Sequence, residues 1–326
     1  KNNKIISKGV TFKSGRPHAE DAALKKAGEH AKGATMYVTL EPCFHNSING
    51  SCSDQILRSG IKEIYISSID PDKRTNGRSI KKFRLNKITT HTGILTNKTR
   101  ELNKFFFESI KSRKPYIKVK MAISNDEKIA WQDYSSKWIS NSNSRIYAHK
   151  IREKSQAILT TAKTIIKDNP RLTIRKINQL TKHLPIIVID RNLKIPIDAK
   201  ILKERSKKRI IIFTSKKNNK MEKLKQMGCE IEILKKNNNG MFNLNKILHQ
   251  IYKLKISDIL VEAGGIFFTN LLKDNLVDEF HLFRANFNIG KSGKPMLVKQ
   301  KLSNLNLTLI KKKKFTNNYY YKYYIK

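Results

Sequence analysis

Short apolar runs alternate with stretches of helical periodicity along the first third of the chain. We expect strands at "TMYVTL" (35–40) and "EIYISSI" (63–69), and helices near residues 18–31 and 53–60. A further apolar run, "KIISKGVTF" (4–12), predicts an additional strand. Such alternation favours a layered α/β fold with a parallel or mixed sheet.

An amphipathic stretch, "TNKTRELNKFFFESIKSRKP" (96–115), closes this region. Its apolar residues have helical spacing and are expected in the core: Leu102, Phe105, Phe106 and Ile110. Pro115 should end the helix, and a new strand, "YIKVKMAIS", begins directly after it. We therefore place a domain boundary near residue 114, giving domains 1–114 and 115–326.

The second part continues the same alternation. Helices are expected around residues 143–153, 218–227 and 244–254. Strand-like runs are "QAILTTAKTII" (156–166), "PIIVID", "RIIIFTS", "EIEIL", "DILVEAGG", and, in the tail, "EFHLFRANFNIG" and "NNYYYKYYIK". Two α/β units of unequal size are the simplest account of the 326 residues.

The formal charge of +41 raises the question of nucleic-acid binding, which requires clustered Lys and Arg. Here lysines are spread through every predicted element, so we expect no nucleic-acid partner. The run 311–314 is interpreted as a solvated strand edge, where lysines discourage edge-to-edge pairing. No apolar stretch has the length of a membrane span, and no signal peptide opens the chain. We expect a soluble, cytoplasmic protein.

Two of the three cysteines, Cys43 and Cys52, lie nine positions apart in "TLEPCFHNSINGSC". They are consistent with a disulfide or with a thiolate pair awaiting a metal, and a reducing compartment weakens the disulfide interpretation. Upstream, "RPHAEDAAL" places His18 and Glu20 at the start of a helix. This set is typical of zinc deaminases, in which one His and two Cys bind zinc and a free Glu transfers protons. The cysteines in that group are commonly three apart.

Each residue alone has an ordinary alternative. A His at a helix start is more often a capping or core residue, a lone Glu is usually solvated, and a buried free Cys is most often inert packing. The joint pattern is what indicates the metal site.

These motifs resemble a known family, the bifunctional riboflavin-biosynthesis deaminase/reductases. "PHAE", "TLEPC" with Cys52, and "DPDKRTNGRSI" (70–80) are similar to its deaminase half. "KMAISNDEKIA", "SKWIS", "AILTTAKTIIKDNPRLTIR" and "VEAGG" follow the order of its reductase half. The resemblance implies a cytidine-deaminase-like α/β/α domain followed by a dihydrofolate-reductase-like α/β domain. It begins inside the family's first domain, so we expect upstream residues to be missing.

For the deaminase, the resemblance implies that His18, Cys43 and Cys52 bind Zn²⁺ and that Glu20 is the catalytic proton shuttle. Asp70 and Asp72 stand where the family contacts the pyrimidine, although an Asp-Pro turn needs no ligand to explain it. The implied substrate is 2,5-diamino-6-ribosylamino-4(3H)-pyrimidinone 5′-phosphate, which is deaminated hydrolytically. Its ribose is then reduced to a ribityl chain.

For the reductase, the resemblance implies NADPH as cofactor, a phosphorylated pyrimidine substrate and a homo-oligomer. The residues implied to contact NADPH are Trp138, Thr164, Asp168, Gly264 and Gly265. Those implied to contact the substrate are Ser136, Arg152, Leu172, Arg175 and Glu262. Trp138 could instead be core, Arg152 a solvated helix residue, and the Gly pair a tight turn. No G-x-G-x-x-G fingerprint is present, which disfavours a standard dinucleotide-binding fold.

Two alternatives remain open. A nucleic-acid or nucleoside deaminase with a basic accessory domain would suit the charge, but it predicts closer cysteines and no cofactor elements. A structural zinc module that binds RNA would leave Glu20 without a role and would usually have four protein ligands.

Overall fold

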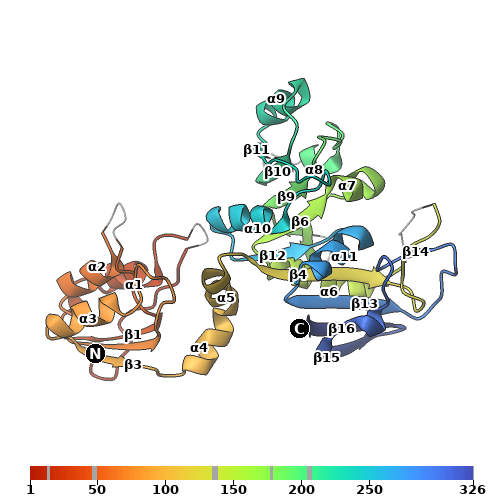
Figure 1. Ribbon diagram of the computed structural model, residues 1–326. Helices are drawn as coiled ribbons and strands as arrows, with labels where there is room; N and C mark the ends of the chain where they lie inside the picture. The colour runs from red at the N-terminus through yellow and green to blue at the C-terminus, as the bar shows by residue number, and fades with distance from the viewer. Residues whose placement is uncertain (13–14, 46–49, 134–138, 177–178, 204–207, 326) are drawn as a thin grey trace. The chain divides into compact units, whose positions relative to one another are not determined.

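The computed structural model describes residues 1–12, 15–45, 50–133, 139–176, 179–203 and 208–325. The chain divides into two compact units, Lys1–Lys111 and Ser112–Lys326. In Figure 1 the first unit runs from red to dark yellow and the second from yellow to blue. Within the described ranges, no helix combines the length and the apolar character needed to cross a membrane.

The first unit contains a three-stranded parallel sheet in the order β1-β2-β3. Its strands are β1 (Thr35–Leu40), β2 (Glu63–Ser68) and β3 (Thr89–Thr92), and its first helices are α1 (Ala19–Ala27), α2 (Cys52–Arg58) and α3 (Arg78–Leu85). Alternate side chains of β2, such as Ile64 and Ile66, are fully buried against Ile56 and Phe83 of the helices. The strands predicted at 35–40 and 63–69 are confirmed.

The strand predicted at residues 4–12 is wrong. This segment has no regular secondary structure, and Ile5 and Val10 are 75% and 77% exposed. A strand must pair its backbone N–H and C=O groups with a neighbour. Among the described residues, β1 pairs with β2 alone, so the apolar run at 4–12 has no strand beside it.

The single helix predicted over residues 96–115 is two helices, α4 (Thr96–Leu102) and α5 (Lys104–Ser112). Asn103 separates them, and its side-chain amide donates to the Thr99 carbonyl at 3.2 Å. An Asn side chain competes in this way with regular helical hydrogen bonding. The break leaves Leu102 74% exposed, so its predicted place in the core is also wrong.

The second unit is built on a nine-stranded sheet in the order β11-β10-β9-β6-β12-β4-β13-β16-β15. Neighbours are parallel except for β13 with β16 and β16 with β15. The strands are β4 (Tyr116–Ile123), β6 (Ala157–Thr161), β9 (Ile186–Ile189), β10 (Ile210–Thr214), β11 (Glu230–Ile233), β12 (Asp258–Val261), β13 (Glu279–Ala285), β15 (Leu307–Phe315) and β16 (Asn318–Ile325). Two small antiparallel pairs accompany it: β5 (Lys128–Ala130) with β14 (Lys294–Pro295), and β7 (Ile174–Lys176) with β8 (Gln179–Lys182).

Helices cover both faces of this sheet (Figure 1). One face packs against α10 (Leu244–Lys253) and α11 (Gly265–Lys273), and the other against α7 (Ala162–Asp168), α8 (Lys200–Lys203) and α9 (Asn219–Gln226). On this second face, α6 (Ser142–Glu153) packs through Ile151 against Phe283 and Tyr320. Successive side chains of β6 point to opposite faces of the sheet. Leu159 packs in the core beneath α10 and α11, and Ile158 packs in the core beneath α7, α8 and α9.

Two sequence predictions in this unit have different outcomes. The strand expected over 156–166 ends at Thr161, whose hydroxyl accepts from the Thr164 N–H and so caps α7; the prediction is wrong for the second half of the run. The lysine run 311–314 lies on β15, the edge strand, and is exposed, which confirms its interpretation as a solvated edge.

Candidate active sites

Three side chains from three segments of the first unit converge on one point. His18 is the N-cap residue of α1, Cys43 follows β1, and Cys52 is the first residue of α2. One ligand atom from each lies within 4.8 Å of the other two, and His18 Nδ1 is 3.3 Å from Cys52 Sγ. Both cysteines are buried. One imidazole nitrogen and two sulfurs match the donors that zinc prefers and leave a fourth tetrahedral position open.

The cluster already favours a thiolate. A hydrogen bond from the Cys52 thiol, opposed by burial, lowers the pKa of Cys43 to about 3. The Cys52 backbone N–H also donates to Cys43 Sγ, at 3.3 Å. The same thiol contact, reinforced by burial, raises the pKa of Cys52. The cluster fits a metal well. Without one, the thiolate of Cys43 makes deprotonation of Cys52 unfavourable, whereas a bound cation would accept both sulfurs as thiolates.

Glu20 lies in the first turn of α1, two residues beyond His18. Burial raises the pKa of its carboxyl, a change that the nearby His18 opposes. A higher pKa makes the carboxylate a stronger base, which suits a group that accepts a proton and returns it.

Glu41 fixes the position of the Cys43 segment. Glu41 is 2% exposed, and its carboxylate accepts three backbone N–H groups, from Asp70 at 3.2 Å, Gly77 at 2.9 Å and Ser79 at 3.1 Å. The Ser79 hydroxyl in turn donates to the Pro42 carbonyl at 2.6 Å. Glu41 therefore joins the end of β1 to the start of α3.

The predicted pyrimidine contacts Asp70 and Asp72 shape the loop that follows β2. Asp70 accepts the Asp72 N–H at 2.8 Å, and burial raises its pKa to about 6. Asp72 is paired with Arg74, which lowers the pKa of Asp72 to about 2. These side-chain contacts stay within the loop, as an Asp-Pro turn would make them without a ligand.

In the second unit, a cavity of about 1280 Å³ opens where the parallel strands β4, β6, β9 and β12 reach their carboxyl ends. This edge is where ligands bind in open α/β sheets. The cavity is lined by the following residues from the sequence prediction: Arg152, Thr164, Asp168, Leu172, Glu262, Gly264 and Gly265.

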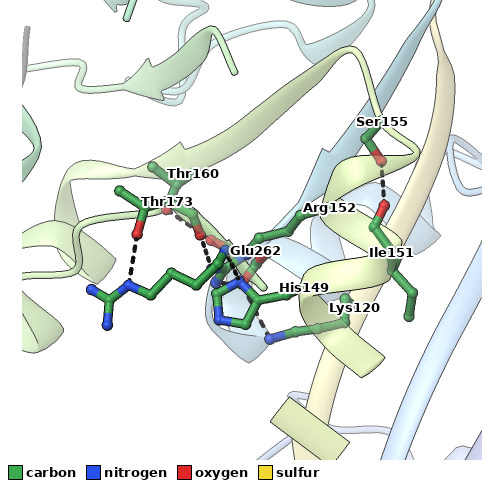
Figure 2. Close-up of polar contacts among 9 residues, drawn as sticks. Lys120, His149, Ile151, Arg152, Ser155, Thr160, Thr173 and Glu262 are labelled. Carbon is green, nitrogen blue, oxygen red and sulfur yellow. Dashed lines mark hydrogen bonds and ion pairs between the residues drawn. The ribbon is translucent and has the colours of Figure 1, made fainter. Parts of the chain in front are cut away.

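An ion cluster forms one wall of the cavity. Glu262 accepts from Arg152 at both carboxylate oxygens, with Nη2–Oε2 at 2.9 Å, and from Lys120 Nζ at 3.1 Å. The two cations outweigh the effect of burial and hold the pKa of Glu262 well below its usual range. Arg152 also donates through Nη1 to the Thr173 carbonyl at 2.9 Å. Figure 2 shows Lys120, Arg152 and His149 gathered around Glu262.

The predicted cofactor contacts that the structure describes come from α7 and from the start of α11. Thr164 and Asp168 lie on α7, and burial raises the pKa of Asp168. Gly264 is open on its Cβ side, whereas a Cβ at Gly265 would lie 2.3 Å from the Met296 carbonyl oxygen. Gly265 is therefore required by packing, whatever else it does. The predicted contacts Ser136 and Trp138 lie outside the described residues.

Leu172 and Arg175 lie close together in the sequence, Leu172 just before β7 and Arg175 within it. Leu172 is buried and has a left-handed backbone (φ 49°), which is unusual for a non-glycine residue. Arg175 is exposed, and its Nε donates to Thr173 Oγ1 at 3.3 Å. The segment that leads into β7 therefore holds one residue in an unfavourable backbone conformation.

Sequence reasoning missed Lys120, His149 and Glu41. A signal for Lys120 was present, because lysines that alternate with apolar residues along a strand are seldom buried unless they are paired. His149 precedes Arg152 by three positions on one helix, and such residues share a face. Glu41 carried no comparable signal, since its partners are distant in the sequence.

Two family comparisons cover most of the chain. Residues 115–321 match the family described as the RibD C-terminal domain. Residues 1–68 match the zinc-binding region of cytidine and deoxycytidylate deaminases.

Individual proteins give the same result. The riboflavin biosynthesis protein RibD of Aquifex aeolicus (strain VF5) is 41% identical over 286 residues, which cover 87% of this chain and 78% of that protein. RibD of Escherichia coli (strain K12) is 30% identical over 302 residues, covering 87% and 79%. Among solved structures, Acinetobacter baumannii RibD, form 2, aligns with a TM-score of 0.86 at 25% identity, covering 100% of this chain and 90% of that one. The Thermotoga maritima deaminase/reductase aligns with a TM-score of 0.81 at 26% identity and the same coverage.

Proposed function

The chain belongs to the RibD family of riboflavin-biosynthesis enzymes, and we propose on that premise how its residues divide the two reactions. It is a bifunctional enzyme with a zinc-dependent deaminase and an NADPH-dependent reductase. The first fold is cytidine-deaminase-like and the second is that of the RibD C-terminal domain, which we take to be dihydrofolate-reductase-like. The observation that carries the proposal is that the His18–Cys43–Cys52 cluster belongs to one compact unit and the cavity to the other.

We assign deamination to residues 1–114 and reduction to residues 115–326. The proposed substrate is 2,5-diamino-6-ribosylamino-4(3H)-pyrimidinone 5′-phosphate. Its deaminated product, 5-amino-6-(5-phosphoribosylamino)uracil, is then reduced at the ribose. The name of the Thermotoga maritima relative contains both activities and supports this order of substrates.

In the deaminase, His18, Cys43 and Cys52 hold zinc. When bound, zinc supplies a Lewis acid that makes a water molecule acidic enough to react near neutral pH. Glu20 would serve as the group that accepts a proton from the attacking water and donates it to the departing amine. Glu41 keeps the Cys43 segment in register with the loop that carries Asp70 and Asp72, which we place beside the pyrimidine.

In the reductase, NADPH supplies the hydride. Thr164, Asp168, Gly264 and Gly265, together with Trp138, are the proposed cofactor contacts. Glu262, Leu172, Arg175 and Ser136 are the proposed substrate contacts. Arg152 uses three of its five N–H groups on Glu262 and Thr173, so we assign it mainly to orienting Glu262, with its other N–H groups left for the substrate.

We further propose that the enzyme works in the cytoplasm as a homo-oligomer. The three free cysteines suit a reducing compartment. Sedimentation velocity of the purified chain measures the oligomeric state.

Selective loss of one activity tests the division. Glu20→Gln should retain zinc but lower deamination by at least about 10²-fold, the effect of losing a general acid/base. The same variant should oxidise NADPH normally when 5-amino-6-(5-phosphoribosylamino)uracil is supplied. Asp168→Ala should impair reduction and leave zinc content unchanged. Loss of reduction in the Glu20→Gln variant would show instead that the two reactions share one site.

A further inference from the structure

His149 lines the reductase cavity beside the ion cluster, yet the proposed reduction leaves it without a role. It lies on α6, one turn before Arg152, and is half-buried. Figure 2 shows its ring beside Lys120, Arg152 and Glu262. Its one hydrogen bond in the described part of the chain is accepted by Nδ1 from the Arg175 backbone N–H, at 3.2 Å.

That hydrogen bond determines where the ring carries its proton. A nitrogen that accepts a backbone N–H is unprotonated, so in the neutral ring the hydrogen is on Nε2. Nε2 has no hydrogen-bond partner among residues 1–12, 15–45, 50–133, 139–176, 179–203 and 208–325. His149 therefore offers an oriented N–H donor at the cavity wall.

The surroundings keep this donor neutral. Burial, and then the positive charge of Arg152, lower the pKa of His149 to about 4. The charged groups facing it are Arg152, Glu262, Arg175 and Lys120, so three cations and one anion surround the ring. Such a wall suits an anionic ligand, and the free Nε2–H group of the neutral ring can donate one more hydrogen bond to that ligand.

We propose that His149 binds the 5′-phosphate of the reductase substrate by donating a hydrogen bond from Nε2. The proposal rests on the reductase function assigned above. Arg175, whose backbone N–H donates to Nδ1 of the ring, is the proposed contact that supplies positive charge to the same phosphate. His149 is thus a substrate-binding residue that selects the phosphorylated form.

Two substitutions separate this role from a structural one. In His149→Asn, the side-chain carbonyl can replace Nδ1 as acceptor for Arg175, but the Nε2 donor is lost. In His149→Gln, the amide NH₂ can replace the Nε2 donor, but the Nδ1 acceptor is lost. His30→Asn, at an exposed position of the other unit, is the matched control.

The zinc-loaded two-domain enzyme is assayed by NADPH consumption on 5-amino-6-(5-phosphoribosylamino)uracil and on the same compound without its phosphate. For the phosphorylated substrate, His149→Asn should raise KM by about tenfold to hundredfold, the loss of one charge-assisted hydrogen bond. The kcat should change little, and His149→Gln should remain closer to the wild type. For the dephosphorylated compound, all variants should share the wild-type KM.

Other outcomes overturn the proposal. Normal KM in His149→Asn with a raised KM in His149→Gln would make His149 a positioning residue for Arg175. An equal rise for both compounds, or weaker NADPH binding by fluorescence titration, would indicate a change in cavity shape. If the wild type consumes no NADPH with either compound, the assigned reductase function itself fails, which is a distinct result.

Discussion

Arg152 on α6 and Glu262 after β12 form a two-point ion pair although they are 110 residues apart in the sequence. The Glu262 side chain is 9% exposed and that of Arg152 is 15% exposed, so both charged groups are largely shielded from solvent. Burying a charge is costly unless it is paired and hydrogen-bonded. This pair therefore fixes the cavity wall in one arrangement, and Lys120 adds a second cation to the same carboxylate.

Removing the charge of Glu262 should destabilise the reductase domain as well as abolish its activity. Glu262→Gln leaves Arg152 and Lys120 buried without an anion, and breaking a buried pair typically costs about 3–5 kcal/mol. Calorimetry should show a lower transition temperature for the reductase domain, identified as the transition that zinc chelation does not move. Glu222→Gln, which removes an exposed partner of Lys225, is the control and should have almost no effect. An unchanged transition in Glu262→Gln would mean that the pair is not formed in solution.

The zinc ligands should be separable from the reductase. Cys43→Ser and Cys52→Ser should each lower zinc content well below one ion per chain, because each removes a thiolate donor. Cys229→Ser changes the one cysteine outside the cluster and is the matched control. Inductively coupled plasma measurement of zinc and NADPH consumption on the deaminated substrate are the two readouts. Retained zinc in both cluster variants would remove these residues from the metal site.

Glu41 should act on the metal without contacting it. Glu41→Gln replaces one acceptor oxygen by an NH₂ that faces backbone N–H donors. Hydrogen bonds between the end of β1 and the start of α3 should therefore be lost. Losing charge-assisted hydrogen bonds of this kind costs about 1.5–3 kcal/mol each. We expect weaker zinc binding in chelator competition and a shifted visible spectrum of the cobalt-substituted enzyme. Glu29→Gln, at an exposed position of the same unit, should change neither.

A merely destabilised deaminase domain gives a different pattern for Glu41→Gln. It would unfold at a lower temperature while its cobalt spectrum and zinc affinity stayed at wild-type values. That result would assign Glu41 to stability alone.

Features encoded within a few residues could be predicted from the sequence. The strand at 35–40 follows from its apolar residues, and the metal cluster from motifs around His18 and Cys43. The start of α7 was missed because one hydrogen bond, from Thr164 N–H to Thr161 Oγ1, ends an otherwise strand-like run.

Contacts between distant segments could not be predicted. Glu41 binds groups 29 to 38 positions later in the chain, and His149 binds the backbone of a residue 26 positions later. These roles exist only once the sheet and helices are assembled. The left-handed backbone of Leu172 is likewise set by its surroundings, since nothing in a leucine favours it.

Glu279 should make the reductase domain sensitive to acid. Its side chain is 3% exposed, and its carboxylate lies 2.6 Å from His281 Nε2 and 3.0 Å from Lys322 Nζ. Burial alone would raise the pKa of Glu279, but His281 and Lys322 lower it to about 2. A folded-state pKa below the unfolded value means that the unfolded chain binds the proton more tightly. The resulting stabilisation is present above pH 4.5, the ordinary value, and is lost as the pH falls toward 2.

Glu279→Gln should remove this dependence. At pH 7 the variant should be less stable by about 3–5 kcal/mol, because Lys322 and the His281 ring lose the buried anion that they contact. As the pH falls from about 5 to about 2, the wild type should lose stability faster than the variant, by up to about 1.4 kcal/mol for each pH step of one, so that the two unfolding temperatures converge. Calorimetry at closely spaced pH values measures both curves, with the reductase transition again identified by its indifference to chelator. Curves that stay parallel throughout this acid range would show that the carboxylate of Glu279 is not the group whose protonation destabilises the domain.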